Sequence, residues 1–278
     1  MKKFLALLSC AVLMAATAVG CGSQNEKITV VSREDGSGTR SAFSELMGVV
    51  KDDKDNTTDT AEVTNSTSVM LTTVAGNKAA IGYVSLGSLN DTVKAVKVDG
   101  VEATAENVKA GKYAVSRPFN IVTGKDLTPL AQDFISYILS TDGQAVVDEK
   151  GYISVTQGEA YKASGQTGTL TIAGSTSVAP LMEVLADKYM ALNSGVKIEI
   201  QQSGSSAGIT SAVEGVSQIG MASRELKDSE TAKGVTAIKI AMDGIAVIVN
   251  KDNSFSELTS DQIRKIYTGE TTQWSDLK

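Results

Sequence analysis

Three times, this sequence places a short stretch of glycine and hydroxyl residues between an apolar, strand-like run and an amphipathic, helix-like run. These loops are residues 32–39, 174–177 and 203–206. At the start of a helix the first backbone N–H groups lack intrahelical acceptors, and the helix dipole is positive there. Glycine lets the backbone approach a ligand, and hydroxyl groups add donors. A single loop of this kind is better explained as a simple N-cap, but three together with an arginine predict a site for a tetrahedral oxyanion.

The two kinds of run alternate along most of the chain, which predicts an α/β fold with a largely parallel sheet. Strand-like runs occupy residues 28–31, 79–86, 119–122, 170–172, 196–200 and 245–249. Helix-like runs occupy residues 39–50, 69–74, 127–138, 178–189 and 209–214. A capping box at Thr259 and Gln262 predicts one more helix. We expect residues 51–60 to form a surface loop and residues 161–168 a flexible linker.

The first 21 residues predict export. Lys2 and Lys3 precede an apolar run over residues 4–19 that is too short for a comfortable membrane span. Residues 18–21 resemble the lipobox of bacterial lipoproteins, in which Cys21 would carry the lipid, although Ala18 stands where leucine is commoner. An ordinary secretory signal is the alternative. Residues 22–27 are small and polar and are expected to form a tether.

Composition narrows the chemistry of the predicted site. The chain has no histidine, and its two cysteines are Cys10 and Cys21, so we expect neither a disulfide nor a thiolate metal site in the folded body. Without Lys2 and Lys3 the chain has 24 basic residues against 32 acidic ones, a net charge of −8. Such a surface repels nucleic acid and anionic lipid. An anion must therefore be held by local donors rather than by the general field of the protein.

Several segments together resemble the phosphate-binding lipoproteins of Pst-type ABC importers. They are residues 32–40 (SREDGSGTR), 80–85 (AIGYVS), 174–180 (GSTSVAP), 204–208 (GSSAG), 219–226 (IGMASREL), 243–250 (DGIAVIVN) and 266–269 (IYTG) with Trp274. The resemblance implies a two-lobed, periplasmic-binding-protein-like fold of type II, with phosphate in the cleft between the lobes. It also implies a lipid-anchored protein on the extracytoplasmic face of the cell membrane that delivers phosphate to permease subunits. We expect a monomer without a cofactor or metal.

The order of these segments differs from that of the family, in which GSTS comes first and REDGSGT falls past the middle. We therefore expect a circularly permuted chain, in which residues 151–155 are joined to residue 170 and new ends open after Trp274. A sequence assembly artefact is the alternative. One lobe is expected to combine residues 28–117 with 250–278, and the other to span residues 118–249. The hinge crossings would then lie near Arg117–Pro118 and Val249–Asn250.

Eight residues are expected to hold phosphate when the family's site is carried over position by position. They are Thr176, Ser177, Ser205 and Ser223 from one lobe and Arg33, Ser37, Gly38 and Thr39 from the other. Arg33 would supply a full positive charge and a planar fork for two phosphate oxygens. The alternative role of Arg33 is a surface arginine paired with Glu34 or Asp35. Ser205 is also compatible with a simple N-cap.

Ser223 departs from the better-known members of the family, which place an aspartate there to accept the proton of hydrogen phosphate. The MASRE spelling over residues 221–225 resembles a Gram-positive branch, so serine need not abolish binding. Asp35 or Asp243 could supply the missing acceptor, and each could instead be a structural carboxylate. We expect phosphate to be preferred over sulfate.

Other functions are weighed against this one. An enzyme acting on phosphoesters is disfavoured because the sequence lacks a P-loop pattern, any histidine and a carboxylate cluster with metal spacing. Serine without an activating base is a poor nucleophile, so no catalytic residue is expected. Two further functions are alternatives. One is a binding protein for sulfate, molybdate or tungstate, and the other is a surface sensor or adhesin that keeps the fold.

Overall fold

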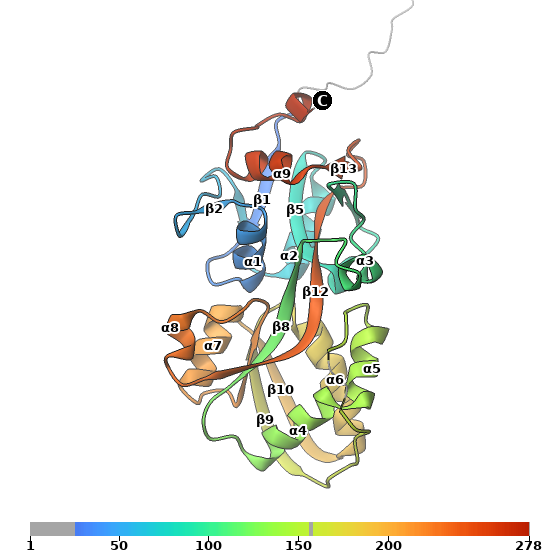
Figure 1. Cartoon of the computed structure of the whole chain (residues 1–278), viewed down its shortest axis with the longest axis vertical. Helices are drawn as coiled ribbons and strands as arrows, with labels where there is room; N and C mark the ends of the chain where they lie inside the picture. Colours follow the sequence, from blue (N-terminus) through green and yellow to red (C-terminus); the bar gives the residue numbers. More distant parts are fainter. Residues whose placement is uncertain (1–25, 156–157, 278) are drawn as a thin grey trace, which may run out of the picture.

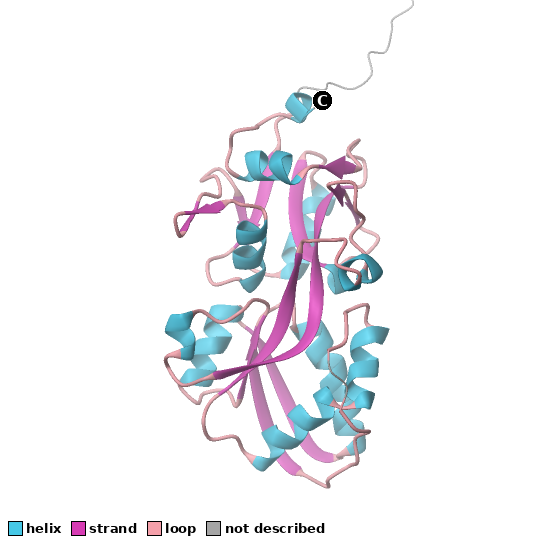
Figure 2. Cartoon of the chain, viewed as in Figure 1, coloured by secondary structure: helices cyan, strands magenta, loops and turns pink. Residues whose placement is uncertain are grey.

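The computed structural model describes residues 26–155 and 158–277. The predicted signal segment, Cys21 and most of the predicted tether lie outside these residues. Two lobes lie one above the other, and two long strands, β8 (Ser116–Thr123) and β12 (Thr236–Asn250), pass between them (Figure 1). Helices flank the strands of each lobe (Figure 2).

In the described part of the chain, a nine-stranded sheet extends through both lobes in the order β10-β9-β11-β8-β12-β5-β1-β4, with β6 also paired to β12. Its other strands are β1 (Thr29–Arg33), β4 (Glu62–Thr64), β5 (Ala80–Ser85), β6 (Val93–Ala95), β9 (Thr167–Gly174), β10 (Gly195–Gln202) and β11 (Ile219–Ala222). Strands β7 (Lys97–Val98) and β13 (Glu257–Leu258) form a separate pair.

The centre of this sheet is antiparallel, so the prediction of a largely parallel sheet is wrong there. Pairs β10-β9, β9-β11, β5-β1 and β1-β4 are parallel, as expected for strands joined through helices. In contrast, β8 is antiparallel to β11 and β12, and β12 is antiparallel to β5. The chain passes between the lobes once in each direction along β8 and β12, so these two strands must run opposite to one another.

Most helices begin at a short polar residue that caps the first turn. The helices are α1 (Gly38–Leu46), α2 (Thr67–Gly76), α3 (Ala105–Lys109), α4 (Pro129–Leu139), α5 (Thr141–Glu149), α6 (Ala179–Leu192), α7 (Ser205–Val213), α8 (Asp228–Thr231) and α9 (Ser260–Tyr267). The side chains of Ser37 and Ser66 accept from first-turn N–H groups of α1 and α2. The capping box predicted at Thr259 and Gln262 is confirmed at the start of α9.

Two main hydrophobic cores lie on either side of the crossing strands. One gathers buried residues from 28–115 and 245–274 together with Ile153, and the other gathers residues from 119–241. Along β12, Ala241 belongs to the second core and Ile245 to the first. This strand therefore changes lobe between residues 241 and 245, earlier than the crossing near Val249–Asn250 suggested by the sequence. The physical reason is that the apolar run 245–249 is buried against β5.

Two segments, expected to be a surface loop and a flexible linker, contain more ordered structure than the sequence indicated. At the start of residues 51–60, β2 (Val50–Lys51) and β3 (Lys54–Asp55) form a small hairpin. In residues 161–168, the Tyr161 hydroxyl donates to the Asp133 carboxylate at 2.6 Å, and its ring packs edge-on against Tyr137. The flexible-linker prediction is therefore wrong at Tyr161, because an aromatic ring with a buried partner stabilises the segment that carries it.

The described ends of the chain lie side by side. The Ile28 N–H donates to the Thr272 carbonyl at 2.8 Å, and the Trp274 N–H donates to the Glu26 carbonyl at 3.2 Å. Residues 26 and 27, expected to belong to the tether, are thus paired with the C-terminal segment. Among the described residues, no helix has the length and apolarity that crossing a membrane would require.

Candidate functional site

The site is built where helices of the two lobes begin opposite one another. The start of α1 in one lobe meets the turn before α6 in the other, since Thr39 Oγ1 lies 2.8 Å from Ser177 Oγ. Gly38 packs against the hydroxyls of Ser205, at the start of α7, and Ser223, just after β11. The three glycine and hydroxyl loops of the sequence therefore converge on one place between the lobes. Their helix starts supply the positive dipole ends that an anion requires.

Arg33 is buried at this junction and contacts residues of its own lobe and of the opposite lobe. Its side chain is 2% exposed, and its Nε and Nη2 donate to the Glu34 carboxylate at 2.7 and 2.8 Å. The same Nη2 donates to Thr176 Oγ1 of the opposite lobe at 3.1 Å. Of the alternative considered from the sequence, the pairing with Glu34 is present, but Arg33 is buried rather than on the surface, and its guanidinium also contacts the opposite lobe. The ion pair orients the guanidinium so that its outer edge faces the hydroxyls.

Hydroxyl groups from both lobes form one connected cluster around Arg33. Thr67 Oγ1 lies 3.0 Å from Ser177 Oγ and 3.3 Å from Thr176 Oγ1, and it accepts from Arg33 Nη1 at 3.5 Å. Thr39 joins this group through Ser177. All five side chains are buried. Hydroxyls donate as well as accept, so they can turn their hydrogens toward an anion without leaving a buried group unpaired.

A second group of hydroxyls lies next to Gly38. Ser175 Oγ donates to Ser223 Oγ at 2.9 Å, and Ser205 Oγ lies 3.3 Å from Ser223 Oγ. The Ser223 N–H donates to Ser205 Oγ at 3.1 Å, so Ser205 caps the end of β11 as well as beginning α7. The two groups together contain Arg33, Gly38 and every hydroxyl residue predicted for the site except Ser37.

The two loops that face each other across the junction differ in their backbone donors. Ser37 is the N-cap of α1, and its Oγ accepts from the Arg40 N–H at 3.3 Å. The first-turn N–H groups of Gly38 and Thr39 have no intrahelical acceptor, as expected for a helix start. Across the junction, however, the Ser177 N–H donates to Ser175 Oγ at 3.2 Å. In this loop the hydroxyls, rather than the Ser177 amide, are therefore the available donors.

Neither candidate carboxylate lies in the cluster. The Asp35 side chain is 97% exposed and pairs with Arg40 at 2.8 Å, so it points into solvent. Asp243 is buried, but its oxygens accept from Ser85 and Arg117. Burial raises the pKa of Asp243 to about 6, against the opposing effect of Arg117. Both carboxylates have structural partners, the second of the roles considered from the sequence.

Sequence reasoning missed Thr67, Ser175 and the orienting role of Glu34. Thr67 begins α2 within residues 65–68 (NSTS), which carry the same helix-start signal as the other loops but no glycine. Ser175 belongs to a loop that was recognised, yet its contact with Ser223 joins residues 48 positions apart. Only the folded chain shows these pairings.

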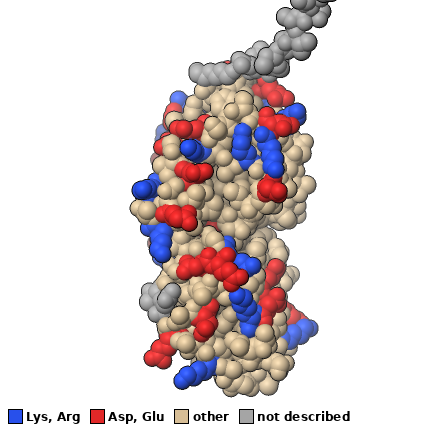
Figure 3. Space-filling view, turned by 90° about the vertical axis from the view of Figure 1, so that its right-hand side faces the viewer, with Lys and Arg blue, Asp and Glu red and all other residues tan. Residues whose placement is uncertain are grey.

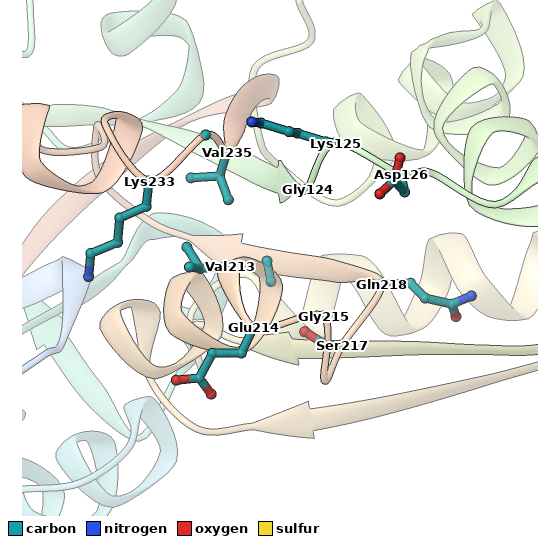
Figure 4. Close-up of a pocket in the computed structure, with 12 residues that line it drawn as sticks. Gly124, Lys125, Asp126, Val213, Glu214, Gly215, Ser217, Gln218, Lys233 and Val235 are labelled. Carbon is teal, nitrogen blue, oxygen red and sulfur yellow. The ribbon is translucent and has the colours of Figure 1, made fainter.

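A separate surface pocket of about 390 Å³, whose lining includes Lys125 and Lys233, lies apart from the hydroxyl cluster (Figure 4). It lies at the C-terminal end of α7, where the helix dipole is negative, whereas the hydroxyl cluster lies at the N-terminal end. The Lys233 and Glu214 side chains on its rim extend away from its centre (Figure 4). Within the described residues there is also no group of three or more His, Cys, Asp or Glu side chains that could hold a metal.

Charged side chains are interspersed on the face shown in Figure 3, with acidic and basic groups side by side over both lobes. This agrees with the view that the general field of the protein does not concentrate anions. The attraction must come from Arg33 and the donors around it.

Comparison with known proteins defines the class first. Residues 18–142 and 160–278 match the PBP superfamily domain, and the chain belongs to this superfamily, with an α/β fold of type II.

Comparison with individual proteins then narrows the family. The phosphate-binding protein PstS 2 of Streptococcus agalactiae is 52% identical over 288 residues, covering 99% of this chain and 98% of the relative. A crystal structure of a phosphate-binding protein of a phosphate ABC transporter from Streptococcus pneumoniae is 46% identical, with a TM-score of 0.73. That structure covers 91% of this chain and 100% of its own. The chain therefore belongs to the PstS family of phosphate-binding proteins, which is a family of transport proteins rather than enzymes.

A more distant relative matches only part of the chain. The phosphate-binding protein PstS of Bacillus subtilis is 34% identical over 142 residues, which is 50% of this chain and 46% of the relative.

Proposed function

We propose that this protein captures inorganic phosphate between its two lobes and delivers it to the permease subunits of an ABC importer. The observation that carries the proposal is the meeting of Arg33, Thr39 and Thr67 from one lobe with Thr176 and Ser177 from the other. A ligand held by both sets of donors stabilises the closed arrangement of the lobes. The names of the family members, which are phosphate-binding proteins, support phosphate as the ligand.

The proposed ligand residues are those predicted from the sequence together with Thr67. They are Arg33, Ser37, Gly38, Thr39, Thr67, Thr176, Ser177, Ser205 and Ser223. Micromolar affinity requires about 8 kcal/mol, and hydrogen bonds to a charged group contribute about 1.5–3 kcal/mol each. About ten such bonds exceed this requirement, and the excess offsets desolvation of phosphate and ordering of the lobes.

The test is calorimetric titration of the purified protein with phosphate, sulfate and arsenate. We expect phosphate and arsenate to bind and sulfate to bind more weakly. Arg33→Ala should weaken phosphate binding at least a hundredfold, since two charge-assisted bonds contribute about 3–6 kcal/mol. Arg264→Ala removes a half-buried arginine of α9, which pairs with Asp261 and Glu270 and has no contact with the hydroxyl cluster, and should leave the affinity unchanged. Tighter binding of sulfate or molybdate than of phosphate would instead show that the site serves another oxyanion. Hydrolysis of phosphomonoesters by the purified protein would show that it is an enzyme.

Attachment to the membrane through a lipid on Cys21 is the second part of the proposal. The motif at residues 18–21 supports it, and an extracytoplasmic place agrees with the family. Cys21→Ser should release the protein from membranes into the medium or periplasm. A wild-type protein that incorporates no labelled lipid would contradict the anchor.

We also propose that the chain is a circular permutant of the wider family, with one lobe formed by residues 28–117 and about 245–278 and the other by about 118–241. The order of motifs supports this, as do the adjacent ends at Ile28 and Thr272. The Streptococcus agalactiae relative aligns with this order over nearly its whole length, which argues against an assembly artefact. A partial match to the Bacillus subtilis protein is what a linear alignment of permuted chains would recover.

A further inference from the structure

Arg117 and Asp243 form a buried ion pair on the two strands that pass between the lobes. They are register partners on β8 and β12, and their side chains are 2% and 0% exposed. Arg117 donates from Nε at 3.3 Å and from Nη2 at 3.2 Å to the same oxygen, Asp243 Oδ2. A buried ion pair contributes little net stability, because desolvation of two charges offsets their attraction. Net stability therefore does not explain why the pair lies where β8 and β12 pass between the lobes, whereas its contacts indicate another role.

One end of this pair contacts the ligand site. Arg117 Nη1 donates to the backbone carbonyl of Ser223 at 3.1 Å. Ser223 is the residue whose hydroxyl accepts from Ser175 and lies beside Ser205 and Gly38. The guanidinium thus fixes the peptide that carries one of the proposed phosphate donors. Arg117 also lies over the ring of Phe119, 5.4 Å from its centroid, which further restricts its position.

The other end contacts the opposite lobe. Asp243 Oδ1 accepts from Ser85 Oγ at 2.9 Å, and Ser85 ends β5. Four residues in contact, Ser223, Arg117, Asp243 and Ser85, therefore extend from the site of one lobe to the sheet of the other. They do so where β12 leaves one core and enters the other.

We propose that Arg117 and Asp243 are positioning residues for the ligand site, which fix Ser223 relative to the strands about which the lobes move. This inference rests on the proposed function, because Ser223 matters only if the cluster binds the anion. In this role Asp243 acts through Arg117 and does not accept a proton from the ligand. The arrangement makes the geometry of the Ser223 donor depend on the geometry of the crossing strands.

The test replaces the pair by apolar residues of similar size. Arg117→Met with Asp243→Leu removes both charges, so no unpaired charge stays buried and the fold is expected to persist. The carbonyl of Ser223 loses its donor, and we expect the Kd for phosphate to rise at least tenfold while the unfolding temperature changes by a few degrees. Arg117→Lys keeps a donor near the Ser223 carbonyl, so its affinity should lie between those of the double variant and the wild type. This variant also provides a test if the double variant folds poorly.

A matched control separates positioning from stability. Val147→Ala truncates a buried side chain of α5 in the core of the same lobe and should lower the unfolding temperature without changing the Kd. If the Arg117 variants bind phosphate within twofold of the wild type, the proposal is wrong. Failure of the wild-type protein to bind phosphate would overturn the proposed function instead, so the two failures are distinguishable.

Discussion

Thr39 Oγ1 and Ser177 Oγ lie 2.8 Å apart, although 138 positions separate the two residues in the sequence. Thr39 is in the first turn of α1 and Ser177 is in the turn before α6, so this contact joins the lobes directly. Two hydroxyls that bond to each other can each turn to bond an anion placed between them. The contact therefore joins the two lobes and is part of the proposed site.

Loss of the Thr39 hydroxyl should weaken phosphate binding. Thr39→Val keeps the shape of the side chain and the backbone N–H of the helix start, but removes one donor to a charged ligand. Such a bond contributes about 1.5–3 kcal/mol, so we expect calorimetry to show a Kd raised about tenfold or more. Thr72→Val, whose hydroxyl donates to the Ser68 carbonyl on the exposed side of α2, is the control and should bind normally. Equal affinities for the two variants would remove Thr39 from the site.

A methyl group at Gly38 should hold the lobes apart. A Cβ there would come within 2.7 Å of Ser223 Oγ and closer still to Ser205 Oγ, both in the opposite lobe. The shortest Cβ contacts in proteins are longer than this, so Gly38→Ala must displace these two buried hydroxyls or the backbone that carries them. We expect at least a tenfold loss of phosphate affinity and a larger radius of gyration in the presence of phosphate, measured by small-angle scattering.

Gly76→Ala is the matched control for this substitution. Gly76 ends α2, and a Cβ at that position would meet nothing within 4 Å. Alanine is favoured over glycine in helices by about 0.5–1 kcal/mol, so this variant should be as stable as the wild type or more so. A Gly38→Ala protein that binds and compacts like Gly76→Ala would show that the junction is looser than the structure indicates.

Asp243 should make the stability of the protein depend on pH. Burial raises the pKa of its carboxyl from 3.8 to about 6, against the opposing effects of Arg117 and Ser85. Between about pH 4 and 6 the folded state therefore keeps a proton that the unfolded state releases. The contribution of Asp243 to the free energy of unfolding is greatest below pH 4 and falls as the pH rises through 6, by about 3 kcal/mol in all. Urea titrations of the wild type and Asp243→Asn across this range would measure the difference.

Asp133→Asn gives the opposite sign in the same experiment. Burial tends to raise the pKa of Asp133, but hydrogen bonds from Tyr161, Tyr189 and Ser164 outweigh it and lower that pKa. Its contribution to stability is therefore present above the unfolded value of 3.8 and is lost as the pH falls through the lowered folded value. If both substitutions changed the pH dependence of the free energy of unfolding in the same direction, the direction given for one of the two pKa shifts would be wrong.

Local sequence pattern indicated more of the loops that meet at the proposed site than of the strand directions in the sheet. Helix starts are encoded by neighbouring residues, so Ser37, Gly38 and Thr39 could be recognised from the sequence, as could the loops around Ser177 and Ser205. The direction of a strand in a sheet depends on the path of the chain between paired strands. The antiparallel pairing of β8 and β12 therefore has no signal in either strand's own sequence. The contact of Arg117 with Ser223 joins positions 106 apart and likewise could not be read from either segment.

Restoring the family's order of segments should give a protein that folds and binds phosphate. A permutant would begin at Gly158, continue to Lys278, pass through a short Gly/Ser linker to Glu26 and end at Val155. The linker need only be short, because Ile28 and Thr272 are hydrogen-bonded. Since closing a short surface loop costs little, we expect a Kd within about threefold of the original. A permutant opened between Gly204 and Ser205, at the start of α7, is the control and should lose binding because its ends separate two parts of the site. If the family-order chain fails to fold while the control binds phosphate, the proposed relation between this chain and the wider family is wrong.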